Sequence, residues 1–308
     1  MTDTGAETAL PEELTSFETF APEIQRAVTE MGWLSPMPVQ RRVTPVMRRR
    51  RDLIAQAMTG SGKTGAFGLP SLEIIDPTLR APQVLVLAPT RELALQIENE
   101  IKQMGKYLQV ETVAVYGGTA YGPQLEAFGR GAQIVVATPG RLLDHLGSGN
   151  LKLDKLRVLV FDEADELLSL GFWPDMRELQ KYLPKQRVTG LFSATMPQRV
   201  VSLARVFLSE PEFVSLTEGG VRAPEEIEHW HFIVAANEKE KALLRLLRYE
   251  DPDSALVFCN TRDDVRFVSD LCDVVYVLDF GRCIASGTPE EVMANEAVIE
   301  AYIGKEAA

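Results

Sequence analysis

Short apolar runs alternate with helical stretches over the first two-thirds of this 308-residue chain. The runs hold four or five residues each, and the segments between them are long enough for a helix. Continuous apolar runs of this kind are typical of strands that are buried on both faces of a parallel sheet. The pattern predicts an α/β fold with a parallel sheet, and the candidate strands are 52–56, 84–88, 112–116, 134–137, 158–161 and 189–192.

The sequence AMTGSGKT (57–64) follows the first candidate strand and precedes an apolar helical segment. Small residues let backbone N–H groups approach a polyphosphate, and the N-terminus of the next helix favours negative charge. Ala57 stands at the first position of the GxxxxGK[ST] pattern, so a Gly/Ser turn with a surface lysine remains the alternative. We expect Lys63 to reach the β- and γ-phosphates and Thr64 to ligate Mg²⁺. The residues predicted to contact the nucleotide in this loop are Thr59, Gly60, Ser61, Gly62, Lys63 and Thr64.

A second acidic element supports this reading, because the apolar run 158–161 ends in Asp162, Glu163, Ala164 and Asp165. A carboxylate at a strand end can hold Mg²⁺, and a neighbouring Glu can orient or deprotonate an attacking water. We assign the metal role to Asp162 and the base role to Glu163. A charged helix start is the alternative for these four residues taken alone.

The charge distribution bears on nucleic-acid binding. The chain has 32 Lys and Arg against 44 Asp and Glu, and its net charge of −12 lies mainly in residues 1–30 and 272–308. A basic cluster of Arg41, Arg42 and residues 48–51 stands in the nearly neutral middle. This cluster is predicted either to meet phosphates or to be a solvated helix end.

The composition argues against membrane proteins, secreted proteins and proteins held by disulfides or a His/Cys metal site. No apolar run approaches the ~18 residues that a membrane helix needs, and the acidic N-terminus lacks the blocks of a signal peptide. Three scattered cysteines and three histidines favour reduced thiols and argue against a disulfide framework or a His/Cys metal site. We therefore expect a soluble, cytoplasmic protein that does not insert into a membrane.

The domain organisation is predicted from changes in composition. Residues 1–14 read as a flexible leader, 15–216 as the first domain and the Gly-, Pro- and Glu-rich segment 217–228 as a linker. A second unit is expected from 229, with strands at 231–235 and 255–259 and helices at 239–248 and 262–271. A hairpin at 274–287 and a helix opened by Thr288 complete it.

The order of the remaining segments resembles the DEAD-box family of ATP-dependent RNA helicases. Phe17 followed by GWLSPMPVQ (32–40) is similar to the family's adenine-reading Q motif, although Trp33 and Met37 stand where Phe and Thr are commoner. The resemblance implies that Gln40 hydrogen-bonds the adenine edge and that Phe17 supports it. It also implies a RecA-like P-loop NTPase domain with ATP and Mg²⁺ as cofactors.

Four further motifs match this family in order and imply RNA as a partner. PTRELA (89–94), the pair Gly117–Gly118 and TPGR (138–141) resemble its RNA-backbone motifs, and SAT (193–195) resembles its coupling motif. Phosphate contacts carry no sequence information, so base specificity should be weak. The implied RNA-binding residues are Pro89, Thr90, Arg91, Gly117, Gly118, Thr138, Pro139, Gly140 and Arg141, and Ser193 and Thr195 join Lys63, Asp162 and Glu163 as catalytic residues.

The resemblance changes near Leu271. ALVFCNTR (255–262) resembles the opening of the family's second RecA-like domain, whereas 272–304 resembles the end of a branched-chain amino-acid ABC-transporter ATPase subunit. The expected arginine-finger motif is absent from the sequence. These features predict a second α/β domain that is truncated and chimeric.

The function expected from these residues is an ATP-dependent RNA helicase and ATP hydrolase, impaired by loss of the later motifs. Two alternatives remain: a nucleotide-dependent RNA-binding module without turnover, or an ABC-transporter ATP-binding protein. The sequence identifies neither the RNA target nor a protein partner.

Overall fold

The computed structural model describes residues 13–216, 230–235, 238–259, 262–279 and 282–299. They belong to two compact units, Met1–Arg222 and Ala223–Ala308. Most of the predicted leader and all of the predicted linker lie outside the described residues. Each unit is described by itself.

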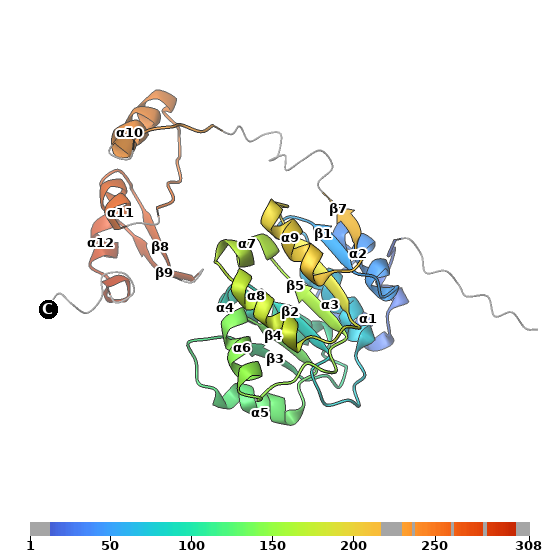
Figure 1. Ribbon diagram of the computed structural model, residues 1–308. Helices are drawn as coiled ribbons and strands as arrows, with labels where there is room; N and C mark the ends of the chain where they lie inside the picture. The colour runs from blue at the N-terminus through green and yellow to red at the C-terminus, as the bar shows by residue number, and fades with distance from the viewer. Residues whose placement is uncertain (1–12, 217–229, 236–237, 260–261, 280–281, 300–308) are drawn as a thin grey trace, which may run out of the picture. The chain divides into compact units, whose positions relative to one another are not determined.

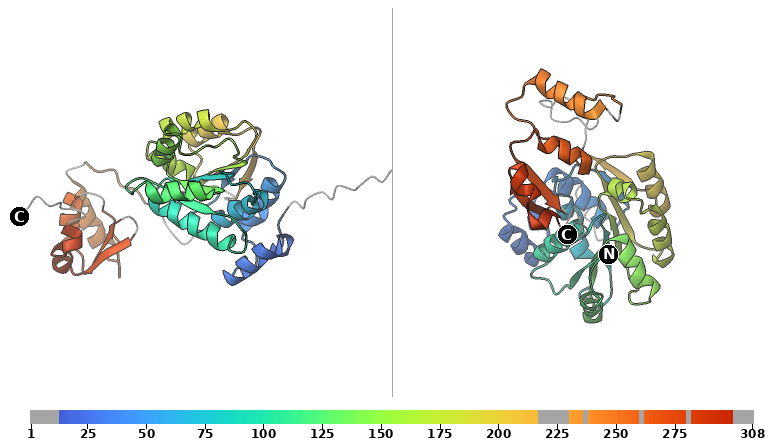
Figure 2. Two further views of the ribbon diagram at one scale, coloured as in Figure 1. Left: turned by 90° about the horizontal axis from the view of Figure 1, so that it is seen from below. Right: turned by 90° about the vertical axis from the view of Figure 1, so that its left-hand side faces the viewer.

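The first unit is a seven-stranded parallel sheet between two layers of helices (Figure 1; Figure 2 gives two further views). The strand order is β3-β4-β2-β5-β6-β1-β7, and every neighbouring pair runs parallel. The predicted α/β fold with a parallel sheet is confirmed. The strands are β1 (Leu53–Gln56), β2 (Val84–Leu87), β3 (Thr112–Val115), β4 (Ile134–Ala137), β5 (Val158–Phe161), β6 (Val188–Ser193) and β7 (Glu212–Ser215).

The helices of this unit precede β1 or lie between successive strands, and they bury their apolar faces on the sheet. Most begin at a clear start signal: Thr90, for example, accepts a hydrogen bond from the Leu93 N–H as the N-cap of α4. The helices are η1 (Phe17–Thr19), α1 (Pro22–Glu30), α2 (Pro38–Arg48), α3 (Lys63–Ile74), α4 (Arg91–Met104), α5 (Gly122–Arg130), α6 (Pro139–Gly147), α7 (Ala164–Ser169), α8 (Trp173–Leu179), η2 (Gln180–Tyr182) and α9 (Gln198–Phe207).

Two apolar cores lie on the two faces of the sheet, because successive strand side chains point in opposite directions. In β2, Val84 and Val86 join the core that α1 to α4 cover, whereas Leu85 and Leu87 join the core that α5 to α9 cover. The central strands β2, β4 and β5 are buried along their whole length. Burial on both faces explains why their sequences are apolar throughout.

The strand β7 was not predicted. It pairs with β1 at one edge of the sheet, and its Phe213 is 57% exposed. Two hydrogen bonds hold the end of β7 and the residue after it. The Leu216 N–H donates to the Gln56 carbonyl (3.0 Å), and Arg42 Nη1 donates to the Ser215 carbonyl (2.7 Å). An edge strand with one neighbour needs little apolar sequence, so periodicity gave no signal for it.

Asp52, the residue before β1, connects this strand to neighbouring segments by hydrogen bonds. Its carboxylate accepts hydrogen bonds from the Thr189 N–H in β6 and from the Ser209 N–H ahead of β7, both at 2.7 Å. We expect Asp52→Ala to lower the free energy of unfolding by about 2–3 kcal/mol, because two N–H groups lose a charged acceptor. Asp52→Asn keeps one acceptor oxygen and should lose about half as much. Urea unfolding of the two variants beside the wild type checks this, and equal losses would contradict it.

The second unit contains α10 (Lys239–Glu250), α11 (Arg262–Ser269), the antiparallel pair β8 (Val275–Asp279) and β9 (Arg282–Gly287), α12 (Pro289–Met293) and α13 (Glu296–Val298). The two predicted helices and the hairpin are confirmed. Thr288 opens α12 as predicted, since its Oγ1 accepts from the Glu291 N–H while Glu291 accepts from the Thr288 N–H.

The predicted strands at 231–235 and 255–259 were wrong: neither segment pairs into a sheet in the described residues. A strand exists only beside a partner, and β8 and β9 pair with each other instead. Ile233 is 95% exposed and Phe258 is 88% exposed as a result. Asn260 and Thr261, the next residues of the ALVFCNTR motif, lie outside the described residues.

Candidate functional site

The predicted site residues gather at one edge of the sheet. Parallel strands end at the same edge, and six of the motifs begin at the last residue of a strand or within two residues after it. The P-loop follows β1, PTRELA follows β2, the Gly pair follows β3, TPGR follows β4, the acidic motif follows β5, and SAT begins at the end of β6. Ligands of open α/β sheets bind at this carboxyl edge.

The phosphate-loop candidate, residues 57–64, wraps around the side chain of Lys63. Gly60 and Gly62 have positive φ angles of 76° and 87°, which glycine adopts without strain. Lys63 begins α3 and is only 7% exposed, and its Nζ donates to the Ala57 carbonyl at 3.3 Å. The ammonium therefore lies inside the ring of backbone that a phosphate would occupy.

Alanine fits the first position of this loop. The Ala57 N–H donates to the Ser193 carbonyl at 3.0 Å, and its side chain is buried. Ala57 is not among the residues with positive φ. The departure from the usual glycine therefore leaves the loop intact.

Gln40 joins the Q-motif segment to the phosphate loop. Its Oε1 accepts from the Met37 N–H (2.9 Å), its Nε2 donates to the Gly62 carbonyl (3.3 Å), and the residue is 1% exposed. Trp33 lies against the first turn of α3, where a Cβ on Gly65 would meet its ring at 2.8 Å. Phe17 packs behind Trp33 with ring centroids 6.0 Å apart.

The acidic motif places one carboxyl group in the interior. Asp162 is 3% exposed, and the pKa of its carboxyl is raised to about 6. Burial is the main cause; Lys63 opposes the shift and the neighbouring Glu163 adds to it. The Glu163 N–H donates to Asp162 Oδ1 at 3.0 Å. Glu163 itself has the left-handed backbone angles φ 48° and ψ 54°, which are costly for a residue with a side chain.

Asp165 connects this motif to SAT, a link to which the sequence assigned no role. Its Oδ2 accepts from the Thr195 N–H (2.9 Å) and the Thr195 hydroxyl (2.7 Å), and its own N–H donates to Ser193 Oγ (3.2 Å). Burial raises the pKa of Asp165, but the hydrogen bonds from Thr195 and Ser193 outweigh it and the pKa lies below its ordinary value. The signal in the sequence was only that Asp165 ends the acidic motif.

The pKa of Asp162 predicts a pH-dependent stability. The folded state takes up a proton near pH 6 and the unfolded state only near 3.8, so lowering the pH stabilises the folded state through this group. From pH 7.5 to pH 5 the wild type should gain about 1 kcal/mol relative to Asp162→Asn, which cannot titrate. Urea unfolding of both proteins at the two pH values measures this. A constant difference between them would contradict the expectation.

The three predicted backbone-binding motifs differ in exposure. Arg91 is exposed, with its guanidinium carbon 4.8 Å from the centre of the Tyr116 ring. Gly117 and Gly118 are also exposed, and Gly118 has a φ of 76°. The remaining residues of these motifs vary in the same way. Thr90 caps α4, and Gly140 is exposed. Thr138 is half-buried, whereas Pro89 and Pro139 are buried.

Arg141 is held inside the protein rather than presented at the surface. It is 9% exposed, and it donates to the Thr119 carbonyl at 3.0 Å and to Gln124 Oε1 at 3.5 Å. Its guanidinium also stacks 4.1 Å from the centre of the Tyr121 ring. In this arrangement Arg141 supports the loop that follows the Gly pair.

The predicted basic cluster is largely neutralised. Arg41 pairs with Glu13, Arg48 with Glu73, and both Arg49 and Arg51 with Glu212. Arg42 donates to a backbone carbonyl. Of the two readings of this cluster, the helix end is therefore the better one.

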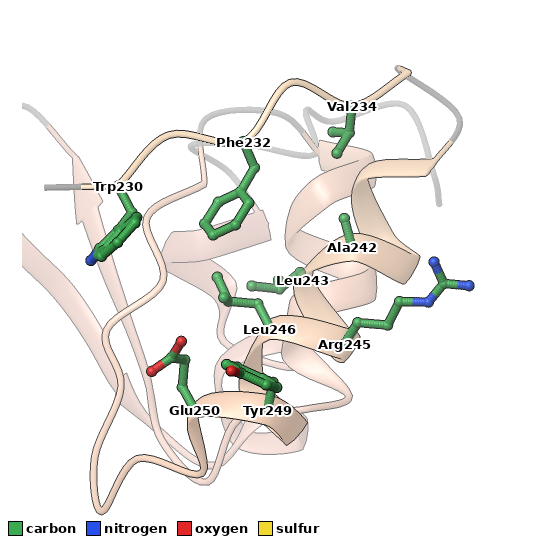
Figure 3. A pocket seen from close by; sticks show the side chains of 9 residues that line it. All are labelled: Trp230, Phe232, Val234, Ala242, Leu243, Arg245, Leu246, Tyr249 and Glu250. Carbon is green, nitrogen blue, oxygen red and sulfur yellow. The ribbon is translucent and has the colours of Figure 1, made fainter.

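A separate pocket of ≈ 1280 Å³ lies in the second unit, between the extended segment at 230–234 and α10. Phe232 points toward Leu243 and Leu246 of the helix, and Tyr249 and Glu250 lie at its far end (Figure 3). Its lining is mainly apolar, and it holds none of the predicted site residues.

Comparison with known proteins finds two family models that match this chain. The model of the DEAD/DEAH box helicase matches residues 37–203. The model of the branched-chain amino acid ATP-binding cassette transporter matches residues 282–308.

The curated relatives are helicases. The ATP-dependent RNA helicase DeaD of Klebsiella pneumoniae is 45% identical over 241 residues, which are 78% of this chain and 37% of the relative. The ATP-dependent RNA helicase DbpA of Bacillus subtilis is 39% identical over 258 residues, 83% of this chain and 54% of the relative. The chain thus spans about two-fifths to one-half of the length of these relatives.

Two solved structures share the fold. A DEAD box protein from the hyperthermophile Methanococcus jannaschii is 34% identical with a TM-score of 0.64, and the match covers 84% of this chain and 70% of that one. An S. cerevisiae dbp5 variant bound to nup159, a gle1 variant, IP6 and ADP is 31% identical with a TM-score of 0.60, covering 64% of this chain and 52% of that one.

Proposed function

Because this chain belongs to the DEAD/DEAH box helicase family, we propose that its first unit binds Mg-ATP and RNA at the carboxyl edge of the RecA-like sheet. The observation that carries the proposal is the buried Lys63 ammonium in a glycine-rich loop, close enough to the Asp162 carboxyl to lower the pKa of that carboxyl against the effect of burial. The activity is that of an ATP-dependent RNA helicase whose turnover and unwinding are impaired in this chain.

The residues suit a magnesium nucleotide. Among the described residues no cluster of three His, Cys, Asp or Glu side chains is arranged to hold a metal ion by itself. Mg²⁺ usually binds through one or two protein oxygens together with substrate phosphates and water, so the Thr64 hydroxyl and the Asp162 carboxylate fit it. When bound, Mg²⁺ would neutralise charge on the phosphates.

The other nucleotide contacts follow from the loop and the Q motif. The backbone N–H groups of 59–62 surround the phosphates, and Lys63 supplies charge to their β and γ oxygens. Gln40 reads the adenine edge with Phe17 in support. Since Gln40 already bonds the Gly62 carbonyl, base recognition and loop position are linked through one side chain.

Hydrolysis and coupling would use the two motifs that Asp165 joins. Glu163 orients or deprotonates the attacking water, and its left-handed backbone conformation sets the direction in which its side chain leaves the backbone. Ser193 and Thr195 hold the end of β6 to the acidic motif, so a movement of either would alter the other. This connection supports their predicted coupling role.

RNA would lie across the loops that follow β2, β3 and β4. Arg91 and Thr90, the exposed Gly117–Gly118 turn and the N-terminus of α6 with Thr138, Pro139 and Gly140 offer backbone contacts. Arg141 contributes by positioning the loop after the Gly pair. Base specificity should be weak, and RNA as the substrate agrees with a cytoplasmic location.

The second half of the chain is proposed to be a fusion. Residues 229–271 would be the start of a second RecA-like domain, joined near Leu271 to the end of an ABC-transporter ATPase, and 217–228 would be the linker. The transporter-family match at 282–308 supports this, as do the unpaired segments at 231–235 and 255–259. Transport ATPase activity is the lesser alternative, since that match contains no phosphate loop. Among the described residues, no helix is long and apolar enough to cross a bilayer.

Calorimetric titration of the full chain with Mg-ATP, and fluorescence anisotropy of a labelled single-stranded RNA, test the proposal. We expect one nucleotide site and RNA binding that strengthens when nucleotide is present. Absence of nucleotide binding by folded protein would disprove it. Binding of both ligands without duplex unwinding would favour the RNA-binding module over the enzyme.

A further inference from the structure

A second cluster of cations lies at the opposite, amino edge of the sheet. A shallow cleft of ≈ 440 Å³ is lined by Arg50, Arg157, Gln186, Arg187 and Val188. Arg157 directly precedes β5, Arg187 directly precedes β6, and Arg50 lies just before β1. Because β5, β6 and β1 are neighbours in the sheet, these distant residues come together.

The three arginines lack acidic partners. None of them forms an ion pair within the described part of the chain, although six arginines elsewhere in the first unit pair with Glu. The nearest acids are engaged: Glu73 binds Arg48, and Asp52 accepts from the Thr189 and Ser209 N–H groups. Burial, together with Arg157, lowers the pKa of Arg50, and burial lowers that of Arg187.

Arg187 is held in place by two hydrogen bonds to the backbone. Its Nη1 donates to the Pro184 carbonyl (2.6 Å) and its Nη2 to the Phe207 carbonyl (3.0 Å). Its Nε is buried and has no hydrogen-bond partner. Arg157 is likewise fixed by a bond from Nη1 to the Ile74 carbonyl (3.0 Å). These bonds use two of the five N–H donors of Arg187 and one of the five of Arg157, so both guanidinium groups keep donors for an anion in the cleft.

Arg50 occupies a position that favours glycine. The Arg50 N–H donates to the Met47 carbonyl and the Arg51 N–H to the Val46 carbonyl, so α2 ends in a Schellman motif. Arg50 is the left-handed residue of that motif, with a φ of 57°. A side chain there strains the backbone, so Arg50 lowers stability at this turn while it adds charge to the cleft.

We propose that this cleft is a second anion site, which binds a phosphate or pyrophosphate group independently of the nucleotide at the carboxyl edge. Guanidinium groups are suited to phosphate because their N–H donors match its oxygens in pairs. The remaining guanidinium donors of Arg187 and Arg157 supply fixed contacts, and Arg50 closes the rim. The phosphate could belong to a small anion or to an RNA phosphodiester, since both present the same oxygens.

Titration with inorganic pyrophosphate tests the site. The full chain carrying Lys63→Ala serves as the background, because that change disables the phosphate loop. We expect one pyrophosphate site in this background, and at least a tenfold loss of affinity when Arg50→Gly is added. Arg49→Gln removes a neighbouring charge that pairs with Glu212 outside the cleft, and should leave the affinity within twofold.

The glycine variant separates binding from folding. Arg50→Gly relieves the strained turn, so its melting temperature without pyrophosphate should equal or exceed that of the background protein. No uptake of pyrophosphate, or equal uptake with Arg50→Gly, would overturn the proposal. Arg157→Gln gives a second measurement, with the same loss expected.

The source of the phosphate follows from a competition experiment. A short single-stranded RNA is added to the Lys63→Ala chain loaded with pyrophosphate. Displacement that Arg50→Gly weakens assigns the site to an RNA phosphodiester. Retention of pyrophosphate at saturating RNA assigns it to a small free anion.

Discussion

Lys63→Ala is expected to weaken Mg-ATP binding at least a hundredfold, a loss of about 3 kcal/mol of binding free energy. Lys63 is the charged side chain enclosed by the phosphate loop, and its ammonium is largely withdrawn from solvent. A contact between a desolvated cation and a polyphosphate is among the strong charge-assisted hydrogen bonds, so its removal should dominate the other substitutions. Calorimetry of wild type and variant measures the ratio directly.

The fold should survive this substitution. Within the protein, the Lys63 ammonium donates to one backbone carbonyl, that of Ala57. Lys102→Ala is the matched control, because Lys102 is an exposed lysine that pairs with Glu98 on α4, away from the phosphate loop. It should bind Mg-ATP as the wild type does. If Lys63→Ala bound within threefold of the wild type, the phosphate loop would not be the nucleotide site.

Turnover is expected to remain at or below about one-thousandth of that of a complete relative, even with saturating RNA. An arginine finger contributes ~10³–10⁵ to the rate of phosphoryl transfer, and the motif that would supply one is missing from this sequence. Phosphate release by this chain and by the Bacillus subtilis DbpA, measured side by side, gives the ratio. RNA should stimulate the relative much more strongly.

The opposite result would be equally informative. RNA-stimulated turnover within tenfold of the relative, abolished by Lys63→Ala, would mean that a transition-state cation reaches the nucleotide from another part of the chain. Glu163→Gln then serves as a second variant, since loss of the base should abolish hydrolysis while Mg-ATP binding persists.

The fold was predictable where sequence and burial coincide. The strands β2, β4 and β5 are buried on both faces, so their composition is apolar without interruption and their limits were found within a residue. Edge and unpaired segments behaved differently. The strand β7 is real but half-exposed, whereas 255–259 has a strand-like composition and no partner. The amino-acid composition of a segment indicates whether it could be buried. Whether it pairs as a strand depends on the partners that the rest of the chain provides.

The predicted site residues lie near one another because a parallel sheet brings all its carboxyl ends to one edge. Motifs that are far apart in sequence, such as the phosphate loop and SAT, meet there for that reason. Side-chain contacts were not predictable in the same way. The position of Arg141 beneath its loop depends on Gln124 and Tyr121, and the arginine cleft joins residues separated by more than a hundred positions. No local pattern marks either arrangement.

The strand β7 has a mechanical consequence. It is hydrogen-bonded to β1 and runs in the same direction, so the last described residues of the first unit, Ser215 and Leu216, lie beside Gln56, the residue before the phosphate loop. A force applied at Leu216 would act directly on the end of β1, beside the phosphate loop. A displacement of Leu216 would therefore shift the backbone of Gln56 and, with it, the start of the phosphate loop.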